Sequence, residues 1–99
     1  MISVYITCRD SREAKKIAKH LLSKRLIACA NIFPVESLFR WKGKLVEQGE
    51  AAMLCKASKK DFEAIEAEVK RMHSYKVPCI VAFDWVRSSR EYSRWVEKK

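Results

Sequence analysis

The chain has few side chains that could serve as nucleophiles, bases or metal ligands. Its thiols and imidazoles are Cys8, Cys29, Cys55, Cys79, His20 and His73. No Cys-x-x-Cys pair occurs, which argues against a structural zinc site, and cysteines in strand-like runs usually act as small buried hydrophobes. His20 falls near the end of a predicted helix, where the helix dipole and solvent account for it, and His73 follows another predicted helix. No nucleophile is paired with a base, so we predict that the protein is not an enzyme.

Two kinds of phosphate recognition can be tested against the residues. An RNA-recognition motif stacks bases on aromatic residues of its third strand, whereas residues 45–55 contain no aromatic side chain. An acylphosphatase-like loop needs an arginine and a glycine after the first strand. Arg9 is present there, but glycine is absent and Asp10 puts negative charge where phosphate would bind. We predict no sequence-specific nucleic-acid binding, although the net charge of +9 allows an anionic partner.

The longest feature that must position these side chains is a predicted hairpin over residues 26–56, which reverses at Lys42-Gly43. Glycine favours the positive φ of a tight turn. Each arm has roughly a dozen residues, or about 40 Å if fully extended. Pro34 marks an edge, bulge or bend in the first arm. Because so long a hairpin exposes strand edges and aromatic side chains, we predict that it is the arm of a homo-oligomer.

The rest of the chain alternates between strand and helix patterns. Residues 2–7 alternate apolar and polar, as in a half-buried strand, and Asp10 with Glu13 forms a capping box for the helix that follows. Ser58 begins a second helix in a Ser-x-x-Asp pattern. The apolar run 79–86 predicts a central strand covered on both faces. Ser88, with Glu91 three residues later, predicts the start of a short C-terminal helix.

This order of elements predicts the fold class. The sequence β-α-β-β-α-β plus a final helix is that of an α+β, ferredoxin-like split βαβ protein, with an antiparallel sheet covered by two helices on one face. The 99 residues are expected to form a single domain over 1–99. Neither the longest apolar run, residues 79–83, nor the start of the chain has the pattern of a membrane span or a secretory leader. We therefore expect a cytoplasmic protein without a membrane partner.

A set of residues in fixed order resembles the divalent-cation-tolerance (CutA) family over essentially the whole chain. The set comprises Cys29-Ala-Asn-Ile32, Pro34, Ser37, Trp41-Lys-Gly43, Glu50, Lys56, His73-x-Tyr75-x-x-Pro78 and Tyr92-x-x-Trp95. The resemblance implies a homotrimer of ferredoxin-like subunits whose long hairpins reach neighbouring subunits. It also implies a role in tolerance to divalent metals, copper especially.

The resemblance further implies candidate sites. The metal candidates are Cys29, His73, Glu50 and Cys79, and the interface candidates are Trp41, Tyr75, Tyr92 and Trp95. Thiolate and imidazole suit copper, and no metal is expected to be needed for folding. The chain departs from the family where carboxylates and proline are usual, with Ser74, Lys76 and Cys79 in their places. An alternative is a trimeric signalling or scaffold module like the nitrogen-regulatory PII proteins, binding a small molecule or protein partner, although the effector loop of those proteins is missing.

Overall fold

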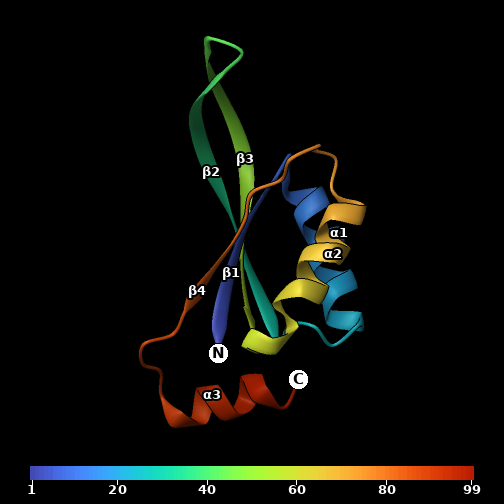
Figure 1. Ribbon diagram of the computed structural model, residues 1–99, viewed down its shortest axis with the longest axis vertical. Coiled ribbons are helices and arrows are strands. Elements are labelled where there is room, and N and C mark those ends of the chain that lie inside the picture. The colour runs from blue at the N-terminus through green and yellow to red at the C-terminus, as the bar shows by residue number, and fades with distance from the viewer.

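The computed structural model describes all of residues 1–99 and has a four-stranded antiparallel sheet with three helices. The elements are β1 (Ile2–Cys8), α1 (Ser11–Ser23), β2 (Cys29–Trp41), β3 (Lys44–Ala57), a 3-10 turn (Lys59–Asp61), α2 (Phe62–Met72), β4 (Ile80–Asp84) and α3 (Arg90–Glu97). The strand order is β2-β3-β1-β4, and α1 and α2 lie together on one face of the sheet (Figure 1). The ferredoxin-like α+β fold predicted from the sequence is confirmed.

The core lies between that face and the two helices. β1 alternates strictly, so that Ile2, Val4, Ile6 and Cys8 are buried, and each pairs across the ladder with a buried small or apolar residue of β3. The apolar stripe of α1 and the two buried residues of α2 close the core from the other side. Each buried aliphatic side chain of this kind contributes about 1.5–3 kcal/mol to folding.

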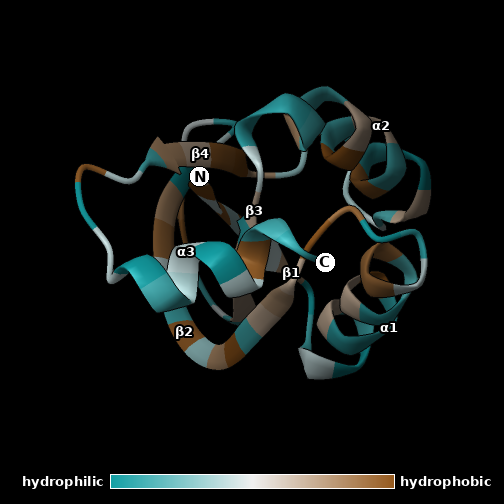
Figure 2. Ribbon diagram, turned by 90° about the horizontal axis from the view of Figure 1, so that it is seen from below, coloured by the Kyte–Doolittle hydropathy of each residue, from teal (hydrophilic) through white to brown (hydrophobic).

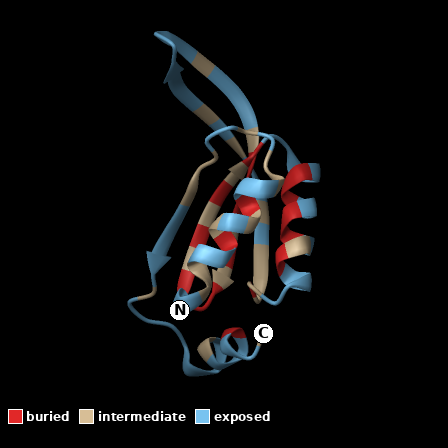
Figure 3. Ribbon diagram, turned by 45° about the vertical axis from the view of Figure 1, so that its right-hand side comes forward, coloured by how far each residue is buried: buried red, intermediate tan, exposed pale blue.

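The hairpin of β2 and β3 extends well beyond the core. Its ladder runs unbroken from Cys29 paired with Lys56 to Trp41 paired with Lys44. Lys42 and Gly43 form the turn with φ of 51° and 78°, the two positive values that a two-residue hairpin turn requires. Figure 3 shows that the outer half of the hairpin is almost wholly exposed. Pro34 lies on β2, an edge strand, as the sequence predicts.

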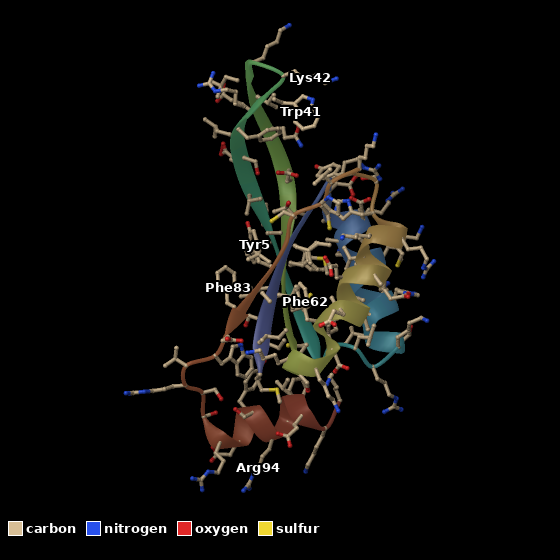
Figure 4. The ribbon with its side chains drawn as sticks, in the orientation of Figure 1. Tyr5, Trp41, Lys42, Phe62, Phe83 and Arg94 are labelled. Carbon is tan, nitrogen blue, oxygen red and sulfur yellow. The ribbon has the colours of Figure 1, made fainter.

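The strand β4 differs from the prediction. The apolar run 79–86 was expected to form a central strand covered on both faces, but β4 is an edge strand that pairs with β1 alone. Val81 is 45% exposed and Phe83 is 56% exposed. Figure 4 shows Phe83 beside Tyr5 on the side of the sheet away from the helices. The prediction was wrong because a continuous apolar run indicates only that a strand becomes covered. Within a single chain, no other element covers the outer face of β4.

Two helix starts also differ from the sequence prediction. Ser58 precedes the 3-10 turn and makes no side-chain cap; its hydroxyl accepts a hydrogen bond from Lys99 instead. At α3 the cap is Ser89, whose hydroxyl accepts from the backbone N–H of Tyr92. Ser88 has the expected spacing to Glu91, but its hydroxyl bonds to Ser93 and to the carbonyl of Ser89. Ser88 and Ser89 can both cap a helix through a hydroxyl group. The spacing to Glu91 therefore pointed to Ser88, although Ser89 is the cap in the structure.

No helix of this chain is both long enough and apolar enough to span a bilayer.

Candidate functional site

The connector between α2 and β4 is tied to the base of the hairpin by Tyr75. Its hydroxyl donates to Oε2 of Glu50 at 2.6 Å and accepts from Nε2 of Gln48 at 3.1 Å. Burial, together with the bond to the Glu50 carboxylate, raises the pKa of Tyr75 above its ordinary value of 10.0. The Tyr75 ring also packs on His73, with ring centroids 4.8 Å apart. The structure therefore brings together two of the predicted metal candidates, His73 and Glu50, through a tyrosine between them.

Both nitrogens of His73 are engaged in hydrogen bonds within the chain. Nε2 lies 2.8 Å from the carbonyl oxygen of Thr7, and Nδ1 lies 3.0 Å from the backbone nitrogen of Tyr75. A carbonyl only accepts and a backbone N–H only donates, so these partners assign the ring proton to Nε2. In this arrangement His73 fastens the connector to the end of β1.

His73 also belongs to a second group of side chains, which lies at the edge of the core. The candidate ligand atoms of Cys8, Glu13 and His73 all lie within 4.8 Å of one another, and the three residues come from β1, α1 and the connector. The Sγ atom of Cys8 also lies 3.7 Å from Sδ of Met53 on β3. Burial, and then the neighbouring Glu13, raise the pKa of the Cys8 thiol from 9.0 to about 12.

Glu13 is only 7% exposed and accepts two backbone hydrogen bonds. Oε1 accepts from the N–H of Arg9 at 2.9 Å, and Oε2 accepts from the N–H of Ser74 at 2.8 Å. Burial raises the pKa of this carboxyl, but the hydrogen bonds from Arg9 and Ser74 outweigh it, so that the pKa is lowered overall. Asp10 caps α1 as expected, because its carboxylate accepts from the N–H of Glu13. The Glu13 carboxylate, however, accepts from the N–H of Arg9 and not from that of Asp10, as a capping box would require.

This group was not predicted from the sequence. Cys8 was interpreted as a buried hydrophobe and Glu13 as a capping residue, and both interpretations hold for the local structure. Glu13 and Ser74 are 61 positions apart, and Thr7 and His73 are 66 apart. No local spacing encodes such contacts; only the packing of α1 and the connector around the end of β1 creates them.

Cys29 lies at the opposite end of the sheet. It pairs with Lys56, which in turn pairs with Ser3, whereas His73 bonds to Thr7. Ser3 and Thr7 are four residues apart on β1, so the positions of Cys29 and His73 along this strand differ by about 13 Å, at ~3.3 Å per residue. Cys79 directly precedes β4 and is a half-buried free thiol. Within one chain the predicted candidates Cys29, His73, Glu50 and Cys79 do not form a common site.

Cys29 is instead joined to an aromatic stack formed by α3 and the segment that precedes it. Its Sγ atom lies 3.4 Å from the hydroxyl of Tyr92, and this contact, followed by burial, raises the pKa of Tyr92 to about 12. The Tyr92 ring stacks between Trp85 and Trp95, at centroid distances of 5.9 Å and 5.7 Å. Trp41, the fourth predicted interface aromatic, lies at the far tip of the hairpin (Figure 4).

A shallow hollow of about 960 Å³ lies between the start of α1 and the base of the hairpin. Apolar residues of β2 line it, and its charged lining carries both signs, with Arg9 and Lys15 beside the carboxylates of Asp10, Glu36 and Glu50. The hollow is open, so in a single chain it does not enclose a ligand.

Comparisons with known proteins bear on the whole chain. A family model described as CutA1 divalent ion tolerance protein matches residues 2–99. Divalent-cation tolerance proteins CutA from Archaeoglobus fulgidus and Thermus thermophilus are 44% and 40% identical to it, in each case over 96% of this chain and 93% of theirs. Among solved structures, CutA of A. fulgidus has a TM-score of 0.96 at 43% identity and covers 99% of this chain and 97% of its own. CutA1 of Pyrococcus horikoshii has a TM-score of 0.95 at 34% identity, over 99% and 96%.

One comparison corrects the expected location. The A. fulgidus structure is described as that of a periplasmic divalent cation tolerance protein. This finding overturns the cytoplasmic location expected from the sequence. The expectation rested on the absence of a leader pattern among these residues, and that absence does not decide the compartment.

Proposed function

Because the chain belongs to the CutA1 divalent ion tolerance family, we propose that it is a non-catalytic homotrimer that binds copper or other divalent metal ions in clefts between its subunits. The observation that carries this proposal is the exposed apolar surface along the hairpin and β4 at the two free edges of the sheet. Figure 2 shows these hydrophobic residues on β2 and β4, away from α1 and α2.

The two edges support a closed ring of subunits. Large hydrophobic side chains exposed along them and at the tip are Phe33, Leu38, Phe39, Trp41, Leu45, Val81 and Phe83. An exposed apolar surface of this extent marks an interaction site, and free strand edges invite pairing with another chain. Since β2 and β4 are different edges, pairing one with the other is heterologous, and such contacts form a ring such as a trimer when the rotation between subunits closes.

The separation of the candidate ligands supports a metal site between subunits. Cys29 and His73 lie about 13 Å apart along the sheet, so an ion that contacts both must draw them from two copies. Tyr75 engages one oxygen of Glu50 and leaves the other for a ligand. Cys79 adds a free thiol in place of a carboxylate, and thiolates favour Cu(I) over harder ions. Sulfur and oxygen donors are thus present, a nitrogen donor requires His73 to give up one of its two hydrogen bonds within the chain, and Lys76 adds an opposing charge in the connector.

The structure offers little to the alternative of a PII-like signalling module. Such a protein acts through a long loop between the second and third strands, but here the two-residue turn Lys42-Gly43 joins β2 to β3. The hollow between α1 and the hairpin is open and does not replace that loop.

The proposal is tested by measuring assembly and metal binding in the same samples. Light scattering coupled to gel filtration gives the number of chains, and calorimetric titration with Cu(II), Cu(I) and Zn(II) gives affinity and stoichiometry. We expect a trimer that binds copper at micromolar affinity or better, and at least tenfold weaker binding in His73→Ala and Cys29→Ser. A monomer contradicts the assembly, and binding unchanged in both variants places the metal elsewhere.

A further inference from the structure

The buried group at the end of β1 lies inside a single chain and away from both sheet edges. We propose that Cys8 and Met53 hold a thiophilic metal ion, Cu(I), beside the Glu13 carboxylate in the core of each subunit. This proposal goes beyond the function proposed above. It needs neither a second chain nor the ligands Cys29, Glu50 and Cys79.

The two sulfur atoms are already placed for a shared ion. Cys8 Sγ and Met53 Sδ are 3.7 Å apart on adjacent strands, where Cys8 pairs with Ala51 and Met53 pairs with Ile6. A metal–sulfur bond of about 2.3 Å reaches both atoms without moving either one, at an S–metal–S angle of about 107°. Soft thiolate and thioether ligands favour Cu(I) over hard cations.

Glu13 supplies negative charge beside the Cys8 sulfur. Each of its carboxylate oxygens accepts one backbone N–H, from Arg9 or from Ser74, and keeps a second lone pair. The carboxylate can therefore approach a cation without losing the hydrogen bonds that hold it. Its neighbour His73 keeps both of its own hydrogen bonds and acts as a positioning residue, because its bond to Thr7 fixes the backbone next to Cys8.

The binding step exchanges one cation for another. The S–H bond of Cys8 breaks, an S–Cu bond forms, and one proton leaves to solvent, while the oxidation state of copper does not change. A singly charged ion replaces a singly charged proton, so the net charge of the buried group is unchanged. Desolvation of an added charge, which opposes most buried ions, is thereby avoided.

The connector joins the buried group to the surface of the protein. Residues 73–79 contain no helix or strand, Val77 is 82% exposed, and two backbone N–H groups of the connector bond to side chains of the group.

The test uses the full-length protein under strictly anaerobic conditions. Cu(I) is delivered as its acetonitrile complex and competed against bathocuproine disulfonate, and X-ray absorption at the copper edge counts sulfur neighbours. Cys8→Ala is compared with Cys55→Ala, which removes an equally buried thiol from the neighbouring strand. These variants are made in a Cys29→Ser/Cys79→Ser background so that the cleft thiols do not contribute, and there we expect the parent and Cys55→Ala to bind one ion per chain with two sulfur neighbours near 2.3 Å. We expect Cys8→Ala to bind at least 100-fold more weakly at this site.

Met53→Leu gives a second readout that does not depend on Cys8→Ala folding. This near-isosteric change keeps the core filled and should lower the sulfur count from two to one. A Cys29→Ser/Cys79→Ser double variant should keep the core ion, whatever becomes of the cleft. The proposal is overturned if Cys8→Ala and Met53→Leu bind as wild type does, if the double variant loses all Cu(I), or if Zn(II) occupies the site as tightly as Cu(I).

Discussion

The hydroxyl of Tyr75 donates a 2.6 Å hydrogen bond to Oε2 of Glu50, across the gap between the α2–β4 connector and the base of the hairpin. The connector is also held by His73 and by the N–H of Ser74 on the core side. Tyr75 thus links the buried group at the end of β1 to the extended hairpin that leaves the domain. The stability of the connector depends on contacts made in both directions.

Removal of this hydroxyl should destabilise the protein measurably. We expect Tyr75→Phe to lower the free energy of unfolding by about 1 kcal/mol, less than the usual contribution of a bond to a charged acceptor because the site is partly exposed. Urea unfolding at fixed protein concentration measures the change. Tyr5→Phe, which removes a half-buried hydroxyl from β1, should change stability by less than half as much. Equal effects in the two variants would assign no special role to the Glu50 bond.

The acid stability of the protein should depend on Glu68. Its hydrogen bond with His20, and then that with Arg71, lower its pKa from 4.5 to about 2 in the folded state. A lowered folded-state pKa means that the contribution of this carboxylate is fully present above about pH 4.5 and is lost as the pH falls towards 2. Glu68→Gln should flatten the dependence of Tm on pH in that window.

The control for that experiment is Glu66→Gln on the same helix, where the carboxylate pairs only with the exposed Lys70. Its Tm profile between pH 4.5 and 2 should follow that of the wild type. If Glu68→Gln keeps the wild-type slope, the contacts between α1 and α2 at His20 do not govern acid unfolding.

The apolar face of β4 should control assembly. Phe83→Glu places a charge on a side chain that is 56% exposed in one chain and that the proposed trimer covers. We expect gel filtration with light scattering to show loss of the trimer, because burying an unpaired charge costs several kcal/mol. Leu22→Glu, on the helix side and 42% exposed, should leave assembly intact. A Phe83→Glu trimer of unchanged mass would remove β4 from the interface.

The hairpin turn should respond in opposite directions at its two residues. Lys42 has a positive φ of 51°, which asparagine tolerates better, so Lys42→Asn should stabilise the protein by about 0.5 kcal/mol. Gly43→Ala should destabilise it by about 1 kcal/mol, although a methyl group there meets no atom within 4 Å, because its φ is 78°. Thermal unfolding of both variants under identical conditions checks the two signs, and a shared sign would refute the turn assignment.

Most of the fold follows from local patterns in the sequence. The alternation at residues 2–7 and the stripe of α1 each face one core, and the positive-φ requirement at Gly43 fixed the turn. The position of β4 could not be predicted, because an apolar run does not say whether one chain or several will cover it. The choice between Ser88 and Ser89 as a cap likewise depends on a one-residue difference in backbone path.

The candidate site was less predictable than the fold. The resemblance supplied Cys29, His73, Glu50 and Cys79, and the structure spreads them over both ends of a subunit. The contacts of Cys8 with Met53 and of Glu13 with Ser74 join elements that are far apart in the chain. Such contacts arise from tertiary packing and cannot be predicted from the spacing of residues that are close in the sequence.

The three tryptophans are divided between the two ends of the molecule. Trp85 and Trp95 lie in the aromatic stack beside α3, while Trp41 is 59% exposed at the hairpin tip. Indole fluorescence shifts with the polarity around the ring, so the two groups are separate optical probes. A variant that keeps only Trp41 reports what the tip contacts, and one that keeps only Trp85 reports whether the C-terminal helix is docked. Intrinsic tryptophan fluorescence can therefore distinguish the separation of subunits from the unfolding of a single chain.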